Sequence, residues 1–500
     1  MDVFVKTPCG ILCGEQTEKF AHFLGVPYAA APIKELRFRK PQPPVPWDGV
    51  RWAKQYGNYC PQVGRISSMN PDAHGDEDCL SLNIFTPACD ERRRPVVIWI
   101  HGGAYLTGCA SEPSRQGGQM CVDADIVVVS IQYRLGPFGQ VDFASLCPDT
   151  GLFDHNCGTW DQVAAINWVI ENIALFGGDP SCITLMGESA GGSSVLTLIT
   201  TPYLRGKIKR AVLGSPAPFL IHSPENGRKA ARQVLERLNI PEEDIHLIRQ
   251  LPTETLIDAV KTTEDSYVNI QPYLIPTGPV VDGDLIPEHP FDAVMHGAAD
   301  GIQFLMGTTA DEGTMFARGK PGDICPTTQT QLQIFWDAHP QLDREKILKL
   351  YQKLPLKKQY HELAKEIVFH LPTVALAKHL SKNNDVYVYR FDYAYPIMRM
   401  LGLGAVHCTD SVLIFGGERI GILKLYALFC GKIGNELAKE VHHRWCNFIS
   451  NGDPNIPRCE HWPKHNNQQA TYILNRKCVV EYKPAAELLN VYGIVRPYGN

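Results

Sequence analysis

The stretch Ile183 to Gly192, which reads ITLMGESAGG, decides the fold. An apolar run leads directly into the sequence Gly187-Glu188-Ser189-Ala190-Gly191, and residues compatible with a helix follow. A serine on a tight turn between a strand and a helix needs glycines two positions before and after it, because a Cβ atom there would collide with both elements. Such a turn exposes Ser189 Oγ and directs the first N–H groups of the helix toward an oxyanion. The pattern therefore predicts Ser189 as a nucleophile.

A second glycine-containing turn lies upstream, where the strand-like run RPVVIWI ends at His101-Gly102-Gly103-Ala104. In α/β-hydrolases the backbone N–H groups of such a loop complete the oxyanion hole. The two motifs occur in the right order, each after a predicted strand. We therefore predict an α/β-hydrolase fold, with a central, mostly parallel twisted sheet and helices on both faces.

The rest of the chain continues this alternation. A helical pattern starts at about Trp160, and new strands are predicted at IQFLMGTT and DVYVYRFDYA. Helical segments such as ENGRKAARQVLERL and REKILKLYQKL separate these strands, and no linker or repeat is visible. We expect a single domain over residues 1–500, with helical cap insertions at approximately 220–300 and 317–380 over the carboxyl edge of the sheet, where ligands bind in such folds.

A nucleophilic serine needs a base, and a carboxylate must orient that base. In this fold the chain order is serine, then acid, then histidine, with the last two on loops that follow strands. Asp311 and Glu312 follow IQFLMGTTA, and His407 follows the glycine-rich LGLGA. Physical reasoning leaves Asp311 and Glu312 as alternatives, and Asp410 could also contact His407.

Composition restricts the class of protein further. The chain has 500 residues, of which 44% are hydrophobic and 20% charged, with a formal net charge of −5. The chain has no long basic cluster, so we do not expect it to bind nucleic acid. No apolar run is long enough to span a bilayer. The N-terminal residues MDVFVKTPCGILCGEQ do not resemble a signal peptide, and the 16 cysteines are scattered without a disulfide pattern. We expect a cytoplasmic protein, or a secreted one if a signal peptide has been removed.

The chain resembles the type-B carboxylesterase and cholinesterase family, in particular the para-nitrobenzyl-esterase-like carboxylesterases, over nearly its full length. The blocks that carry the resemblance occur in the family's order and include EDCLSLNIFTP, VIWIHGGAY, VSIQYRLGPFG, TLMGESAGGSS, TADEGTMF and HCTDSVLIFG. The resemblance implies Glu312 as the acid, His407 as the base, and the backbones of Gly102, Gly103 and Ala190 as oxyanion donors. It implies hydrolysis of carboxylic esters through an acyl-enzyme, and that mechanism needs no cofactor or metal. We expect small neutral esters as substrates, because the loop between Cys60 and Cys79 is polar and contains no tryptophan. The expected partner is a small-molecule ester, and the expected assembly is a monomer or homodimer.

The resemblance also implies several binding and structural residues. The predicted substrate-binding residues are Phe219, Tyr105, Tyr273, Leu274 and Phe415, with core packing as the alternative for the acyl-side residues and Phe415 expected beneath His407. Cys60 and Cys79 correspond to a family disulfide, although two reduced thiols are equally expected in a cytosolic protein. The loop between these cysteines contains no tryptophan, which argues against a cation–π site for choline.

Three alternatives remain open at this point. A catalytically silent binding or adhesion protein can use the same fold after losing the serine, but all three triad residues are present here. A lipase would be expected to carry a long apolar lid, whereas the loop between Cys60 and Cys79 includes Arg65, Asp72 and several other charged residues. His442, His443 and Cys446 have a spacing that suits a metal, but a helix through VHHRWCNFI favours a structural interpretation.

Overall fold

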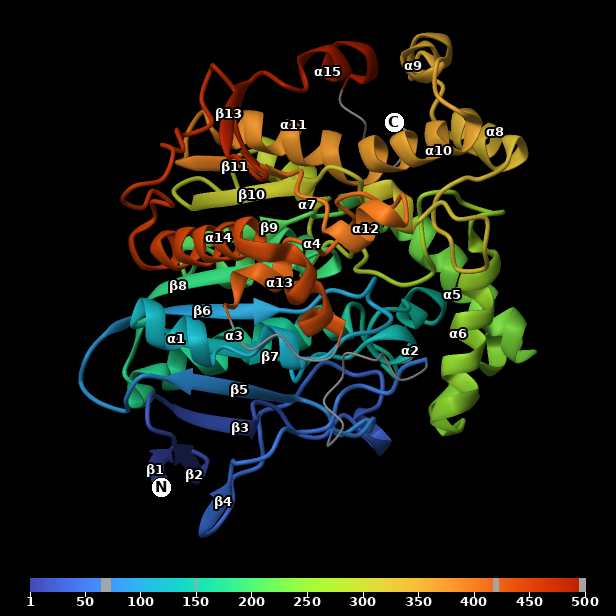
Figure 1. Ribbon diagram of the computed structural model, residues 1–500. Coiled ribbons are helices and arrows are strands. Elements are labelled where there is room, and N and C mark those ends of the chain that lie inside the picture. Colours follow the sequence, from blue (N-terminus) through green and yellow to red (C-terminus); the bar gives the residue numbers. More distant parts are fainter. Residues whose placement is uncertain (64–72, 149–150, 417–421, 494–500) are drawn as a thin grey trace.

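The computed structural model describes residues 1–63, 73–148, 151–416 and 422–493, and the side chains from 433 onward in the last of these segments (Figure 1). Residues 64–72 of the loop between Cys60 and Cys79, including Arg65 and Asp72, lie outside the described residues. That this loop is polar and not a long apolar lid therefore stays a prediction.

Thirteen strands of the described residues form one sheet, in the order β1-β2-β3-β5-β7-β6-β8-β9-β10-β11-β12-β13, with β4 paired to β2. The strands are β1 (Asp2–Thr7), β2 (Gly10–Gln16), β3 (Ala21–Pro27), β4 (Val50–Trp52), β5 (Ser81–Thr86), β6 (Arg94–Ile100), β7 (Val127–Ile131), β8 (Gly178–Glu188), β9 (Arg210–Gly214), β10 (Gln303–Thr309), β11 (Val386–Phe391), β12 (Ala470–Leu474) and β13 (Val479–Tyr482).

The centre of the sheet is parallel and its margins are antiparallel. Parallel pairing runs from β7 through β6, β8, β9, β10 and β11 to β12. Antiparallel pairing runs from β1 through β2, β3 and β5 to β7 and joins β12 to β13, whereas the short strand β4 pairs with β2 in parallel. Strands β7 and β9 are buried at every position, as expected for strands covered on both faces. Because parallel strands end at the same edge, the loops after β6, β8 and β10 meet there.

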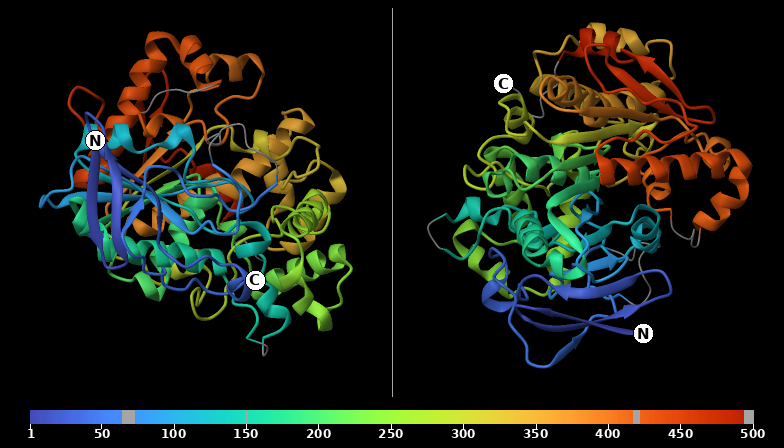
Figure 2. Two further views of the ribbon diagram at one scale, coloured as in Figure 1. Left: turned by 90° about the horizontal axis from the view of Figure 1, so that it is seen from below. Right: turned by 90° about the vertical axis from the view of Figure 1, so that its left-hand side faces the viewer.

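Helices cover both faces of this sheet (Figure 2). On one face lie α1 (Gly118–Ala124) and α14 (Ile422–Asn451), and on the other lie α3 (Cys157–Asn172), α4 (Ala190–Thr200), α7 (Pro290–Met295) and α11 (Leu371–Leu380). The remaining helices are α2 (Gly136–Gly139), α5 (Pro224–Leu238), α6 (Thr253–Tyr267), α8 (Gln329–Ala338), α9 (Arg344–Tyr351), α10 (Leu356–Lys365), α12 (Pro396–Met400), α13 (Ser411–Ile414) and α15 (Ala486–Tyr492). Among the described helices, none has both the length and the apolar character needed to cross a bilayer. The predicted α/β-hydrolase architecture is confirmed.

Helices in the two predicted cap segments differ in where they lie. Helices α5, α6, α8 and α10 gather beyond the end of the sheet toward which the arrow of β6 points (Figure 1). Helix α11, although it belongs to the second segment, packs against β10 and β11 and so covers the sheet. The division into one domain with two cap insertions stays a prediction.

One fully buried and one partly buried ion pair stabilise the N-terminal half of the fold. Arg134 and Asp161 form a two-point contact, with Nε–Oδ2 at 2.8 Å and Nη2–Oδ1 at 2.7 Å, and both side chains are almost completely buried. Arg37 contacts Glu77 in the same way, at 2.8 and 2.7 Å. Removing one partner of such a pair typically costs about 3–5 kcal/mol, because it leaves a buried charge uncompensated.

Candidate active site

Ser189 occupies a strained turn between β8 and α4. Its backbone has φ 60° and ψ −126°, a conformation that side-chain-bearing residues rarely adopt. A Cβ atom on Gly187 would lie 2.3 Å from the carbonyl oxygen of Gly191, and one on Gly191 would lie 2.2 Å from that of Ile100. Glycine is therefore required two positions before and after the serine, for the steric reason inferred from the sequence.

The loop after β6 lies directly against this turn. A Cβ atom on Gly102 would lie 3.1 Å from Ser189 Cβ. Gly103 has φ 106°, and a Cβ atom there would lie 2.1 Å from the carbonyl oxygen of Thr107, so this loop also needs glycine. Ala190 is the first residue of α4, where helix N–H groups have no partner within the helix. The backbones of Gly102 and Ala190 are therefore both close to Ser189.

Glu312 is fully buried and pairs with His407. It starts a short 3₁₀ helix (Glu312–Met315) after β10, and its Oε2 accepts a short hydrogen bond from His407 Nδ1. Its Oε1 accepts hydrogen bonds from Ser215 Oγ at 2.6 Å and from Thr309 N at 2.7 Å. Burial alone would raise the pKa of Glu312, but the charge of His407 and these hydrogen bonds outweigh burial and lower it. Glu312 is therefore held as a carboxylate that orients the imidazole.

The other two candidate carboxylates have structural contacts. Asp311 accepts a hydrogen bond from Ala405 N at 2.8 Å and so holds the loop that leads to His407. Asp410 caps α13 by accepting from Ser411 N at 2.9 Å, and it also accepts from Tyr389 OH at 2.7 Å. Of the three carboxylates that the sequence left open, Glu312 is the one paired with His407 Nδ1.

His407 is buried between aromatic rings, with its Nε2 atom facing Glu188. The rings of Phe316 and Phe369 lie 5.0 and 4.7 Å from the imidazole, measured between centroids. His407 Nε2 lies 3.2 Å from Glu188 Oε1 but makes no hydrogen bond within the described part of the chain, to Ser189 Oγ or to any other atom. In unliganded enzymes the bond from base to nucleophile is often loose and tightens only with substrate.

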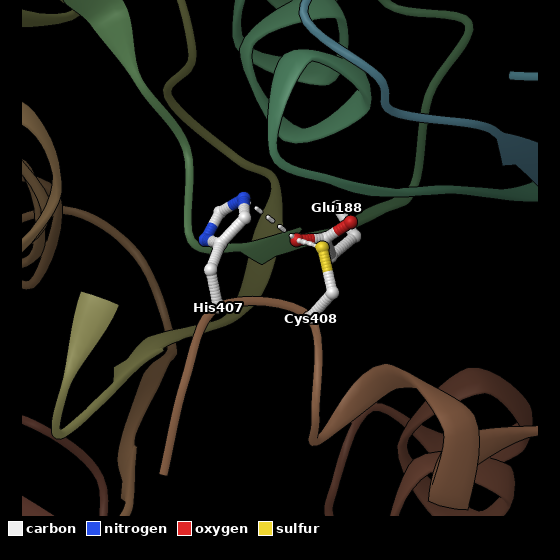
Figure 3. A group of neighbouring side chains, drawn as sticks. All are labelled: Glu188, His407 and Cys408. Carbon is white, nitrogen blue, oxygen red and sulfur yellow. Dashed lines mark hydrogen bonds and ion pairs between the residues drawn. The ribbon is translucent and has the colours of Figure 1, made fainter. Parts of the chain in front are cut away.

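Two residues at this site were missed by the sequence analysis. Glu188 precedes Ser189 and Cys408 follows His407, and Figure 3 shows both side chains beside the imidazole. Cys408 Sγ donates a hydrogen bond to Glu188 Oε1 at 2.9 Å. Burial, together with the charge of Glu188, raises the pKa of the Cys408 thiol to about 12. The sequence could have pointed to both residues, because each is the direct neighbour of a predicted triad residue.

The charge around His407 determines when it can act as a base. Burial lowers its pKa, but the neighbouring Cys408, Glu312 and Glu188 outweigh burial and raise that pKa well above the ordinary histidine value. Only the neutral imidazole can accept a proton from a serine. We therefore expect activity to rise with pH through a midpoint above about 6.5, the ordinary histidine pKa.

Glu188→Gln tests this electrostatic arrangement. Without the carboxylate beside Nε2, the imidazolium loses a stabilising charge, so the pKa of His407 should fall and the acid limb of kcat/KM should move about one pH unit lower. The measurement is kcat/KM against pH with a neutral ester, and Asp311→Asn serves as the control because Asp311 bonds Ala405. An unchanged midpoint in Glu188→Gln would show that Glu188 does not influence the base.

The predicted substrate residues are all buried. Phe219 lies in a short 3₁₀ helix (Pro218–Leu220) after β9, and Leu274 packs with Ala230 and Tyr267. Tyr105 OH lies 3.4 Å from Ser194 Oγ. Contact of these residues with substrate stays a prediction.

Aromatic packing accounts for two further members of that set. Tyr273 packs edge-on against Phe335, at 4.7 Å between ring centroids. Phe415 packs edge-on against Trp99, at 5.1 Å. The rings found on His407 are those of Phe316 and Phe369, which the sequence analysis did not single out. The contact of Tyr273 with Phe335 is a core-packing contact, which is the alternative named for the acyl-side residues.

The structure shows the state of the two cysteines that correspond to a family disulfide. Cys60 and Cys79 are both free thiols and fully buried, which is one of the two alternatives considered.

The candidate metal ligand His442 on α14 makes contacts between helices. His442 Nδ1 lies 2.7 Å from the carbonyl oxygen of Ile414, and His442 Nε2 lies 3.1 Å from Asp123 Oδ2. These contacts join α14 to α13 and α1, in line with the structural interpretation of this helix.

The fold and the serine turn together define a serine hydrolase of the α/β-hydrolase class. A family profile described as the carboxylesterase family matches residues 1–490. The para-nitrobenzyl esterase of Bacillus subtilis (strain 168) is 32% identical over 97% of each chain. The liver carboxylesterase of Sus scrofa is 30% identical over 90% of this chain and 84% of its own. A carboxylesterase structure from Geobacillus stearothermophilus has 33% identity and a TM-score of 0.83 over 98% of this chain and 99% of its own.

The chain belongs to the carboxylesterase family. It is a serine hydrolase of carboxylic esters, and this interpretation is favoured over the silent binding protein and the lipase.

Proposed function

We propose that the protein hydrolyses small neutral carboxylic esters, with acyl chains of about two to six carbons, through an acyl-enzyme on Ser189. His407 is the base and Glu312 is the acid that orients it. The observation that carries this assignment is the buried Glu312–His407 pair, held on loops beside the strained turn of Ser189.

Acylation begins when His407 Nε2 takes the proton of Ser189 Oγ. The oxygen attacks the ester carbonyl carbon, and the resulting oxyanion accepts hydrogen bonds from the N–H groups of Gly102, Gly103 and Ala190. The intermediate then collapses, and the alcohol leaves with the proton from His407. Each oxyanion donor contributes about 3 kcal/mol to lowering the barrier.

Deacylation repeats these steps with water as the nucleophile. His407 takes a proton from the water, the hydroxide attacks the acyl carbon, and Ser189 Oγ leaves with that proton. Glu312 stays ionised throughout and stabilises the imidazolium that forms twice per turnover, which agrees with its lowered pKa.

The segment after β9 supports an acyl site beside the nucleophile. Ser189 N donates a hydrogen bond to the carbonyl oxygen of Gly214 at 2.9 Å. Ala217 N donates to Ser193 Oγ at 2.9 Å, so this segment is tied to α4, the helix that follows Ser189. Phe219 follows two residues later and is buried, which makes it a suitable wall for a short acyl chain.

Choline esters should not be preferred substrates. A desolvated cation–π site is worth about 2 kcal/mol, or about thirtyfold in affinity, and the loop between Cys60 and Cys79 has no tryptophan to form one. The measurement compares kcat/KM for butyrylthiocholine and for a neutral butyrate thioester with a matched leaving-group pKa. A preference of about tenfold or more for the choline ester would contradict the proposed substrate class and would require another cation site.

We also propose a cytoplasmic location, with the protein acting as a monomer or homodimer. The 16 cysteines are scattered without a disulfide pattern, which is typical of proteins from a reducing compartment. Alkylation of denatured protein, quenched directly from intact cells, should give peptides with both Cys60 and Cys79 alkylated. A peptide pair linked through Cys60 and Cys79 would contradict the reducing compartment.

A further inference from the structure

Three potential metal ligands meet beside the proposed nucleophile. Glu188, His407 and Cys408 each offer one ligand atom, and these atoms lie within 4.8 Å of one another. Figure 3 shows the three side chains next to each other. Glu188 Oε1 lies 3.2 Å from His407 Nε2 and 2.9 Å from Cys408 Sγ. His407 is 5% exposed, and its buried Nε2 has no hydrogen-bond partner within the described residues. A buried imidazole nitrogen without a hydrogen bond therefore lies within ion-pair distance of a carboxylate and close to a thiol.

We propose that Glu188, His407 and Cys408 form a tridentate site for a thiophilic divalent cation, Zn²⁺ above all, and that the bound cation reversibly inhibits the esterase. The inhibition rests on the proposed role of His407 as the base, whereas the binding does not. The proposal departs from the prediction of no metal site, which followed from a mechanism that needs no metal.

The donor set matches the preferences of zinc. Zinc binds a thiolate sulfur at about 2.3 Å and imidazole nitrogen or carboxylate oxygen at about 2.0–2.2 Å in a tetrahedron. Such a tetrahedron places nitrogen and oxygen about 3.4 Å apart, and sulfur and oxygen about 3.6 Å apart. The corresponding distances of 3.2 and 2.9 Å require only a small opening of the cluster. The mixture of nitrogen, oxygen and sulfur suits Zn²⁺ far better than Mg²⁺ or Ca²⁺.

The surroundings of His407 also fit a metal ligand. Ligating histidines almost always donate their other ring N–H to a carboxylate or carbonyl, which fixes the tautomer with Nε2 free. Glu312 already provides this contact through His407 Nδ1. The contact between Glu312 and His407 Nδ1 therefore suits both a catalytic base and a zinc ligand, because each needs Nε2 free.

The backbone at Cys408 has an uncommon conformation. Its φ is 68°, in the left-handed region where a side chain other than Gly, Asn or Asp is uncommon. When the cation binds, the S–H bond of Cys408 and the Nε2–H bond of protonated His407 break, the S–Zn and N–Zn bonds form, and the protons leave to bulk water. Glu188 Oε1 no longer accepts from the thiol and ligates the cation instead. Because the cation holds the Nε2 lone pair, His407 cannot take a proton from Ser189.

Cobalt provides a direct measure of binding that is independent of activity, because a cysteine thiolate bound to Co²⁺ gives a charge-transfer absorption. Chelator-treated enzyme titrated with Co²⁺ should develop this band to saturation at about one equivalent, as expected for a single site with an open fourth position. Cys408→Ala should abolish the band. Cys446→Ala is the matched control and should keep it, because Cys446 also lies beside a histidine and a carboxylate, with its sulfur 3.6 Å from His442 Nε2.

Zinc inhibition is measured on the same variants, each normalised to its own metal-free activity. Zn²⁺ should inhibit the wild type and Cys446→Ala, a chelator should restore activity, and Cys408→Ala should need at least about 100-fold more Zn²⁺ for half-inhibition. A band that is absent from the wild type, or that survives in Cys408→Ala, would overturn the site. A saturated band with undiminished turnover would instead leave the site standing and contradict the inhibition, together with the proposed role of His407.

Discussion

Replacing Ser189 with alanine should lower kcat for p-nitrophenyl esters by about 10⁶-fold, because serine and histidine act as a unit and neither works alone. The substitution should leave the fold intact. Alanine meets the same backbone restrictions as serine at φ 60°, and the turn is held by the hydrogen bond from Ser189 N to Gly214, which the side chain does not make.

Ser194→Ala is the matched control for this variant. Ser194 lies on the same helix and is buried, but its Oγ atom bonds Gln162 and Tyr105 rather than facing the reaction. It should keep turnover of the same order of magnitude as the wild type. Substantial turnover by Ser189→Ala, with contaminating esterase excluded by active-site titration, would remove Ser189 from the mechanism.

The second large effect is expected for Glu312→Gln, with a fall in kcat of about 10⁴-fold. A glutamine can present its NH₂ group to Nδ1, which would force the imidazole proton onto Nε2 and leave no acceptor for the serine proton. Glutamate and glutamine side chains are nearly the same size, so the remaining oxygen of the glutamine can still accept the hydrogen bonds from Ser215 and Thr309. The loss should therefore be catalytic and not structural.

Asp311→Asn is the control for the acid, because both carboxylates lie on the loop after β10. Asparagine keeps an oxygen that can accept from Ala405 N, so its effect should be at least tenfold smaller than that of Glu312→Gln. The measurements are kcat for both variants and thermal unfolding as a check on folding. The reverse ranking would move the acid to Asp311.

The parts of the fold that follow from steric and periodic rules could be predicted from the sequence. The glycines around Ser189 were inferred from the collision that a Cβ atom would cause, and in the structure a Cβ atom at either position would lie 2.3 Å or less from a backbone oxygen. The parallel centre of the sheet was inferred from alternating strands and helices. Both inferences use local patterns, which determine local geometry.

The contacts that the sequence did not reveal join distant segments. Glu188 and Cys408 are 220 residues apart, and no periodicity relates them. The choice between Asp311 and Glu312 depends on how a short 3₁₀ helix orients two adjacent side chains, which composition does not encode. Packing on His407 by Phe316 and Phe369 likewise depends on the positions of a loop and a helix in space.

The central claim is that Ser189 becomes acylated during turnover, and trapping the nucleophile tests it most directly. The enzyme is inactivated with diethyl p-nitrophenyl phosphate, which releases p-nitrophenol as the nucleophile takes up the diethylphosphoryl group, and the labelled peptide is sequenced by mass spectrometry. We predict one label per chain, located on Ser189, with inactivation in proportion to labelling. Inactivation with the label on another residue, or labelling that leaves Ser189 unmodified while activity is lost, would contradict the account.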